Sequence, residues 1–225
     1  MEFLSGFVLE ERWERIRQVS ANRTRYLTLI LEDIHYAQNA SAVVRSCDCF
    51  GIQDLHFIHN IPVEGQTKIR SHVTQGSDKW IDIHRYFIRD NVGTEKTTKK
   101  AISGLKKTGY RIIATTPDRN ALHLEQLDIG QGPMAVIMGN EQRGVTGSAA
   151  SAADEFVTIP MYGFAESYNI SVSAALLLHS LVTRLHESRI EWQLPEQDLH
   201  SLRFKWLMKT IPKAKEILRV YEQSF

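Results

Sequence analysis

Residues 134–144 read MAVIMGNEQRG, five apolar residues followed at once by a loop with a glycine near each end. The apolar run 134–138 is short and uninterrupted, which predicts a strand buried on both faces. Gly139 and Gly144 let the following loop turn tightly and approach a ligand closely. The loop matches known phosphate loops poorly, because the middle glycine of G-x-G-x-x-G and the Lys-Ser/Thr of a P-loop are absent.

Five other stretches have a similar apolar, β-favouring character and are predicted strands: residues 26–31, 54–59, 80–87, 111–115 and 156–159. Helical spacing of apolar residues lies between them, at residues 40–50, 94–107 and 170–185. Strands that alternate with helices predict an α/β fold with a mostly parallel sheet covered by helices on both faces. Ligands bind beyond the carboxyl ends of such strands, so the loops after residues 31, 138 and 159 are candidate sites.

The first of these segments is residues 39–45, NASAVVR. Asn39 stands where a helix is expected to begin, and asparagine is a good N-cap. Ser41, Arg45 and Asp48 are predicted to project from the side opposite the apolar stripe, so Arg45 could reach a site at the strand ends. Taken alone, the spacing favours a simpler interpretation, in which Arg45 pairs with Asp48 on the surface.

The third segment is residues 159–173, IPMYGFAESYNISVS, which leads into a long apolar helix. Pro160 and Gly163 predict an irregular loop. Ser167, Asn169 and Ser171 gather at the expected helix start, where backbone N–H groups need partners. Simple helix capping explains part of this cluster, but three small polar side chains exceed what one cap needs, so a ligand site remains open as well.

The overall charge is close to balanced, with 27 Lys and Arg against 26 Asp and Glu, but its distribution is not. Residues 11–25 hold five Arg and two Glu (+3), and residues 200–219 hold six Lys or Arg and one Glu (+5), which leaves −7 for the rest. Clustered cations attract phosphate backbones. Charge alone still favours the interpretation that both stretches are amphipathic helices with solvated charged faces, rather than segments that bind a nucleic acid.

Composition excludes several classes of protein. The 225 residues are 43% hydrophobic and 24% charged, which is typical of a globular chain with a sizeable core. No apolar run reaches the roughly 20 residues of a membrane helix, and the N-terminus lacks a signal peptide, so a cytoplasmic protein is expected. Cys47 and Cys49 are too close to staple a fold, and Cys47 lies on an apolar helix stripe, which favours a packed thiol over a zinc ligand.

The three segments, taken in order, resemble the motifs of the SpoU/TrmH type of SPOUT-class RNA ribose 2′-O-methyltransferases. The first motif resembles Asn39 through Arg45 followed by Cys49-Phe50-Gly51, the second Gly139-Asn140-Glu141 with Gly144, and the third Ile159-Pro160-Met161 through Ser167-Tyr168-Asn169-Ile170-Ser171. The match spans about residues 26–185. It departs at Tyr168, where the family often carries leucine, and this changes the shape of the cofactor site.

The resemblance implies a deep trefoil knot in the C-terminal part of the core, an exception to the usual absence of knots. It also implies a homodimer that binds S-adenosylmethionine and acts on tRNA or another structured RNA, with no metal and no membrane. By position, the cofactor site would involve Thr115, Gly139, Ile159 and Tyr168, and the catalytic set would be Asn39, Arg45, Glu141, Ser167 and Asn169.

The basic ends are similar to those of the tRNA-acting members, which methylate a guanosine ribose in the D-loop. The expected organisation is therefore a basic helical extension at residues 1–25, a methyltransferase domain at 26–190 and a second basic helical extension at 191–225. Three alternatives remain open. The first is an rRNA methyltransferase and the second is a non-catalytic RNA-binding protein, both on the same scaffold. The third is a nucleotide-binding α/β protein whose basic ends are incidental.

Overall fold

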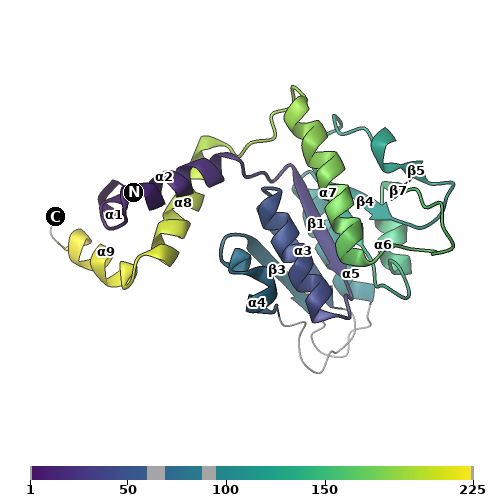
Figure 1. The fold of residues 1–225 in the computed structure, drawn as a ribbon, viewed down its shortest axis with the longest axis horizontal. Helices are drawn as coiled ribbons and strands as arrows, with labels where there is room; N and C mark the ends of the chain where they lie inside the picture. The colour runs from purple at the N-terminus through teal and green to yellow at the C-terminus, as the bar shows by residue number, and fades with distance from the viewer. Residues whose placement is uncertain (1, 60–68, 88–94, 224–225) are drawn as a thin grey trace. The chain divides into compact units, whose positions relative to one another are not determined.

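The computed structural model describes residues 2–59, 69–87 and 95–223. The chain forms two compact units, one of residues 25–192 and one that combines residues 1–24 with 193–225. Each unit has its own secondary structure (Figure 1). No helix in the described ranges is both long and apolar enough to cross a membrane.

The larger unit is built on one sheet in which every pair of neighbouring strands is parallel. The strand order is β3-β2-β1-β6-β4-β7-β5. The two strands at its centre are fully buried, as the apolar run 134–138 predicted. The strands are β1 (Leu27–Glu32), β2 (Asp54–His59), β3 (Asp82–Phe87), β4 (Arg111–Thr115), β5 (Leu122–His123), β6 (Met134–Met138) and β7 (Glu155–Thr158).

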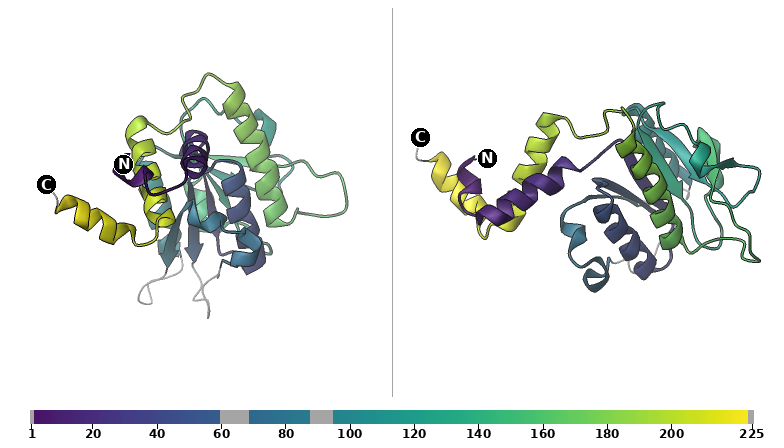
Figure 2. Two further views of the ribbon diagram at one scale, coloured as in Figure 1. Left: turned by 60° about the vertical axis from the view of Figure 1, so that its left-hand side comes forward. Right: turned by 45° about the horizontal axis from the view of Figure 1, so that its top comes forward.

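Helices cover both faces of this sheet, as expected (Figures 1 and 2). On one face, α3 (Ala37–Cys49) and α7 (Ile170–Glu187) lie side by side over the larger apolar core. On the other face, α5 (Glu95–Lys107) and α6 (Gly147–Ala152) cover a second cluster that includes Ile30 and Ile137. Shorter helices complete the unit: α4 (Ser71–Thr74), η1 (Ser77–Lys79) and η2 (Leu124–Gln126).

Three predicted strands have different bounds in the structure. The first and last are shifted by one residue, to Leu27–Glu32 and Glu155–Thr158. The third begins at Asp82, because Trp80 instead ends the 3-10 turn η1. Strand β5 has only two residues, too few to produce a detectable alternation, and it was not predicted. The expected helix 94–107 is observed as Glu95–Lys107, and Thr94 lies outside the described residues.

Helix α3 corrects two predictions about the first motif. The helix begins at Ala37 and its N-cap position is Tyr36, so Asn39 lies inside the first turn and is not the N-cap. Ser41 does not project from the polar side: it is fully buried, and its hydroxyl donates to the carbonyl of Ala37 at 2.7 Å. Cys47 is a buried free thiol, as its place on the apolar stripe predicted.

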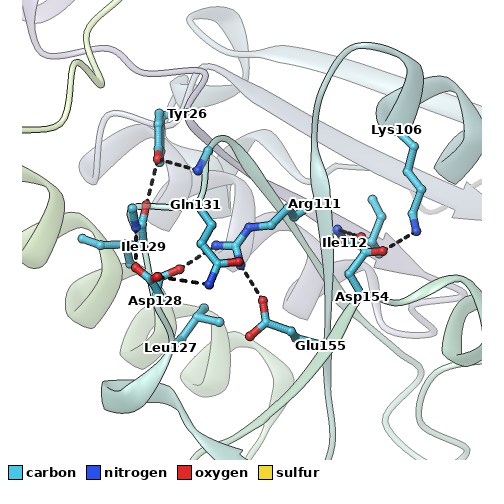
Figure 3. Close-up of polar contacts among 12 residues, drawn as sticks. Tyr26, Lys106, Arg111, Ile112, Leu127, Asp128, Ile129, Gln131, Asp154 and Glu155 are labelled. Carbon is cyan, nitrogen blue, oxygen red and sulfur yellow. Dashed lines mark hydrogen bonds and ion pairs between the residues drawn. The ribbon is translucent and has the colours of Figure 1, made fainter.

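A polar network fixes the amino ends of β4, β6 and β7 (Figure 3). Arg111 forms an ion pair with Glu155 and donates to the carbonyl of Asp128 at 2.6 Å. Asp154 accepts hydrogen bonds from Lys106 at 2.6 Å and from the amide of Ile112 at 2.8 Å. Burial acts to raise the pKa of Asp154, but these hydrogen bonds and the Lys106 charge lower it overall. The network therefore holds three strand starts together at the edge opposite the candidate loops.

The smaller unit contains α1 (Glu2–Ser5), α2 (Glu10–Ala21), α8 (Glu196–Thr210) and α9 (Ala214–Glu222). The guanidinium of Arg23 lies over the ring of buried Trp206, 5.2 Å from its centroid. Arg203 donates from Nε to the hydroxyl of Ser20 at 2.9 Å, which joins α8 to α2. Trp206 is thus a packing residue, and part of the basic charge of this unit is used internally.

Candidate active site

The loops after β1, β6 and β7 meet at the carboxyl edge of the sheet. Strand β6 lies next to β1 at the centre, where the chain changes direction across the sheet, and ligands bind at such points in open parallel sheets. Two cavities open here, one of about 500 Å³ and one of about 460 Å³. Glu141, Ser167 and Tyr168 line both, so the two cavities adjoin.

The loop after β6 doubles back on itself. The amide of Asn140 donates to the carbonyl of Gly144 at 3.0 Å, and the amide of Gly144 donates to the carbonyl of Asn140 at 2.8 Å. A Cβ at Gly139 would lie 2.0 Å from the carbonyl carbon of Gly144, so no other residue fits without moving backbone. Gly144 has a φ of 68°, a left-handed conformation that glycine adopts at little cost. The backbone of this loop therefore explains why glycine stands at both positions of the motif.

The side chain of Asn140 anchors this loop to the end of β1. Its Nδ2 donates to the carbonyl of Asp33 at 2.8 Å, and its Oδ1 accepts from the amides of Gln142 and Arg143 at 2.9 and 3.2 Å. Asn140 belongs to the second motif but was not among the predicted site residues. Its place in the second motif, two residues after β6, was the sequence signal for a role at this loop.

Three predicted catalytic residues are joined by hydrogen bonds. Asn39 donates from Nδ2 to Oε1 of Glu141 at 2.9 Å and accepts at Oδ1 from Nδ2 of Asn169 at 3.2 Å. The amide of His35 also donates to Oε2 of Glu141 at 3.4 Å. One residue from each motif therefore contributes to a single polar chain, with Asn39 in the middle.

Asn169 also caps α7, so the capping interpretation of the third motif is confirmed. Its Oδ1 accepts from the amide of Ser171 at 2.9 Å and from the Ser171 hydroxyl at 2.6 Å. Because the carbonyl oxygen serves the cap, the amide nitrogen is left to bind Asn39. Capping and site assembly are thus performed by opposite ends of one side chain.

The larger cavity is lined by all four residues expected to bind the cofactor, Thr115, Gly139, Ile159 and Tyr168. Apolar side chains of α7 and η2 form part of its wall, and Glu141 and Glu166 contribute carboxylates. Its volume is within the range of roughly 300–1,000 Å³ that is typical of small-molecule sites. Arg143 adds a guanidinium, so the cavity offers charges of both signs beside an apolar wall. S-adenosylmethionine carries cationic groups and a carboxylate, so these residues fit it.

The smaller cavity is lined by Asn39, Glu141, Ser167 and Asn169 from the predicted catalytic set. Arg45, the fifth member, lines neither cavity and is exposed on α3. The structure of one chain therefore brings together eight of the nine predicted site residues. The described residues contain no group of three or more His, Cys, Asp or Glu that could hold a metal ion.

Two features of the site involve residues outside the three motifs. Buried Glu32 accepts hydrogen bonds from the amide and the hydroxyl of Thr146, both at 2.8 Å, which ties the exit of the β6 loop to β1. Arg70 and Tyr36 line the smaller cavity. Arg70 follows no predicted strand, and Tyr36 lies just before the motif, so pattern analysis assigned neither residue a role.

Comparisons with known proteins agree with this geometry. The SpoU rRNA Methylase family model matches residues 26–179. A tRNA (guanosine(18)-2′-O)-methyltransferase of Borreliella burgdorferi is 39% identical, covering 92% of this chain and 89% of that protein. The Aquifex aeolicus protein with the same description is 30% identical over 96% of each chain. The crystal structure of an A. aeolicus TrmH/SpoU tRNA modifying enzyme superposes with a TM-score of 0.75 at 28% identity, covering 91% of this chain and 98% of that one.

The parallel sheet with two adjoining cavities at its carboxyl edge defines an α/β protein with a small-molecule site at the switch point of the sheet. The extent of the family match and the identity to full-length relatives then settle the family. The chain belongs to the SpoU rRNA Methylase family.

Proposed function

We propose that this protein transfers a methyl group from S-adenosylmethionine to the ribose 2′-hydroxyl of guanosine 18 in the D-loop of tRNA, with release of S-adenosylhomocysteine and the hydroxyl proton. The observation that carries this assignment is the hydrogen-bonded chain Glu141–Asn39–Asn169, which lies where two cavities adjoin. A donor and an acceptor substrate must meet in this way for an in-line transfer. The two relatives described above, which match nearly the whole chain, are both tRNA (guanosine(18)-2′-O)-methyltransferases.

In this assignment the larger cavity binds the cofactor. S-adenosylmethionine, when bound, supplies an activated methyl group. Thr115, Gly139, Ile159 and Tyr168 shape the cavity, and the close backbone approach at Gly139 keeps the β6 loop in place. Asn39 and Asn169 orient the Glu141 carboxylate and the third-motif loop, and Ser167 provides a hydroxyl where the cavities meet.

Arg45 binds the phosphate next to the target ribose and stabilises negative charge that develops on the 2′-oxygen. A bidentate guanidinium suits this role better than that of a base, because it resists deprotonation. Arg45 is exposed and lines neither cavity of its own chain, which favours delivery from a second copy. Val172 and Leu176, exposed one turn apart on α7, provide apolar surface for such a homodimer.

Three further assignments belong to the same hypothesis. The C-terminal part of residues 26–190 threads as a deep trefoil knot, which is supported by the insertion of β6 between β1 and β4 and by the tight packing of Gly139 on Gly144. The extensions at residues 1–25 and 191–225 bind tRNA phosphates, supported by their clustered cations. The protein acts in the cytoplasm, where two free cysteines remain reduced.

The test is methyl transfer from labelled S-adenosylmethionine to an unmodified tRNA transcript. We expect one methyl group per tRNA, located at the ribose of guanosine 18 by mass spectrometry of nuclease digests. A transcript whose D-loop guanosine is already 2′-O-methylated is the matched control and should accept no label. Transfer to ribosomal RNA instead of tRNA would reassign the substrate, and cofactor binding without any transfer would identify a non-catalytic RNA-binding protein.

A further inference from the structure

The smaller cavity has four lining residues to which neither the motifs nor the proposed cofactor site gives a role: Tyr36, Ala37, Gln38 and Arg70. Its volume of about 460 Å³ is large enough for a small ligand. Because it shares Glu141, Ser167 and Tyr168 with the larger cavity, a ligand in it would lie directly beside one in the other. The question is what chemistry its own residues would recognise.

Arg70, an exposed residue, gives this cavity a positive charge. It is the one cation among the described residues that line it. Its backbone amide donates to the hydroxyl of buried Ser41 at 2.8 Å, so its main chain is held against α3, two residues beyond Asn39. Within the described part of the chain, its guanidinium has no hydrogen bond or ion pair. A guanidinium without a protein partner is available for bidentate recognition of a phosphate.

Tyr36 adds an aromatic surface to the same cavity. Tyr36 is 53% exposed, so its aromatic ring is accessible to a ligand. The ring of His35 packs edge-on against it, with centroids 4.8 Å apart and planes at 85°, which restricts its orientation. Exposed aromatic rings beside cations are the surfaces on which proteins stack unpaired bases of RNA.

We propose that the smaller cavity is the subsite for the target nucleotide, where Tyr36 stacks on a base and Arg70 binds one of the two phosphodiesters that flank the target ribose, the other being the one assigned to Arg45. This assignment deepens the proposed function and rests on it. The occupant is a nucleotide of single-stranded RNA, because the cavity combines a cation, an aromatic ring and polar side chains next to the cofactor site. Arg70 is a substrate-binding residue in its own protomer, distinct from Arg45, which lines neither cavity.

The experiment measures kcat and KM of methyl transfer to the unmodified tRNA transcript for Arg70→Ala, Arg70→Lys, Tyr36→Ala and Tyr36→Phe. We expect Arg70→Ala to raise KM about tenfold and to reduce the salt slope of tRNA affinity by about one. Arg70→Lys should keep the salt slope but recover only part of the affinity, because lysine cannot bind bidentately. Tyr36→Ala should also weaken affinity about tenfold, whereas Tyr36→Phe, which keeps the ring, should remain near wild type.

Arg189→Ala is the matched control, because it removes an exposed arginine just after the C-terminal end of α7 that lines neither cavity. It should keep the wild-type KM and salt slope. Calorimetric affinity for S-adenosylmethionine should stay within about twofold in all variants. A wild-type KM and salt slope in Arg70→Ala would overturn the assignment. So would a changed oligomeric state in Arg70→Ala or Tyr36→Ala, because the cavity would then be covered by a second copy.

The subsite can be tested separately from the proposed methyl-transfer activity. If the wild-type protein transfers no methyl group, tRNA affinity measured by fluorescence anisotropy still tests the subsite. Loss of affinity in Arg70→Ala and Tyr36→Ala but not in Arg189→Ala would support the subsite without catalysis. Equal affinities in all variants would reject it.

Discussion

The side-chain amide of Asn39 donates a hydrogen bond to Oε1 of Glu141 across 2.9 Å, although 102 positions separate the two residues in the chain. The contact joins the first turn of α3 to the loop after β6. It gives the Glu141 carboxylate a fixed direction where the two cavities adjoin. This relationship leads to the first prediction.

Replacing Asn39 by aspartate removes the amide donor and places a second carboxylate beside Glu141. Like charges at this separation repel each other, so the Glu141 carboxylate would be displaced. We expect kcat to fall about a hundredfold, the size of effect that a displacement of about 1 Å can have. Asn120→Asp is the control, because exposed Asn120 also contacts a carboxylate, that of Asp118, but lines neither cavity. Equal activity of the two variants would show that the Asn39–Glu141 contact does not matter.

Arg45→Ala should reduce methyl transfer by about a thousandfold, the upper range for the loss of one group that stabilises developing charge. Affinity for S-adenosylmethionine should remain near wild type, because Arg45 does not line the cofactor cavity. Rapid-quench assays with saturating tRNA measure the rate of methyl transfer, and calorimetry measures the affinity for S-adenosylmethionine. Wild-type turnover in this variant would exclude Arg45 from the reaction.

Delivery of Arg45 from a second copy predicts complementation between two impaired variants, assayed at a concentration of S-adenosylmethionine too low to fill the Gly139→Ala cavity. Arg45→Ala keeps the cofactor cavity, and Gly139→Ala keeps Arg45. After mixing and subunit exchange, half of the dimers are mixed, and each has one intact site if the arginine acts across the interface. We expect about a quarter of wild-type activity. No recovery, in a mixture that mass spectrometry shows to contain mixed dimers, would place Arg45 in its own protomer.

Gly139→Ala should weaken the affinity for S-adenosylmethionine about tenfold or more, because its Cβ would meet the backbone of Gly144 at 2.0 Å. Calorimetry measures this directly. Gly147→Ala is the matched control: a Cβ there meets nothing within 4 Å, and the residue begins α6, where alanine is favourable. If both variants bind the cofactor equally, the tight turn is not required for the site.

The lowered pKa of His56 predicts that the protein loses stability as the pH falls. Burial, followed by the nearby charge of His84, lowers the pKa of His56 to about 4, and Asp54 opposes this in part. The unfolded chain takes up this proton near pH 6.5 and the folded protein does so only near pH 4, so stability is full above pH 6.5 and falls between the two values. We expect a loss of about 2 kcal/mol between pH 7 and pH 5 from this group.

Urea denaturation at several pH values measures the effect, and His56→Gln should flatten the pH dependence over this window. The ring of His56 stacks on His84 at 4.6 Å and lies 3.1 Å from the hydroxyl of Tyr86, so the variant will also lose some stability at neutral pH. The slope with pH, not the absolute stability, is therefore the readout. His72→Gln, at an exposed position, should retain the wild-type slope.

The basic C-terminal helix gives the last prediction. Lys205→Glu and Lys209→Glu, at exposed positions of α8, should weaken tRNA binding and flatten its dependence on salt. Arg203 belongs to the same basic stretch, residues 200–219, but it bonds Ser20 inside the unit, so Arg203→Glu should lower the melting temperature. Filter binding across a salt series, together with thermal melts, distinguishes the two cases. Unchanged affinity in the lysine variants would identify α8 as a solvated face.

Much of the fold could be predicted because its central strands are buried on both faces. Such strands need continuous apolar runs, and the bounds predicted for β2, β4 and β6 agree with the structure. Edge strands and helix starts were predicted less well. The helix of the first motif begins before Asn39 because backbone geometry, not a side-chain cap, starts it at Ala37.

The amino-acid sequence by itself determined the parallel sheet, the three loops that carry polar residues, and the two glycines of the β6 loop, because these follow from local burial and backbone freedom. Only the tertiary structure decided that Asn39 bonds Glu141 and Asn169, that Arg45 lines neither cavity of its own chain, and that Arg70 and Tyr36 line one of them. The physical reason is that strand order and loop packing bring distant residues together, and no local pattern of side chains encodes those distances.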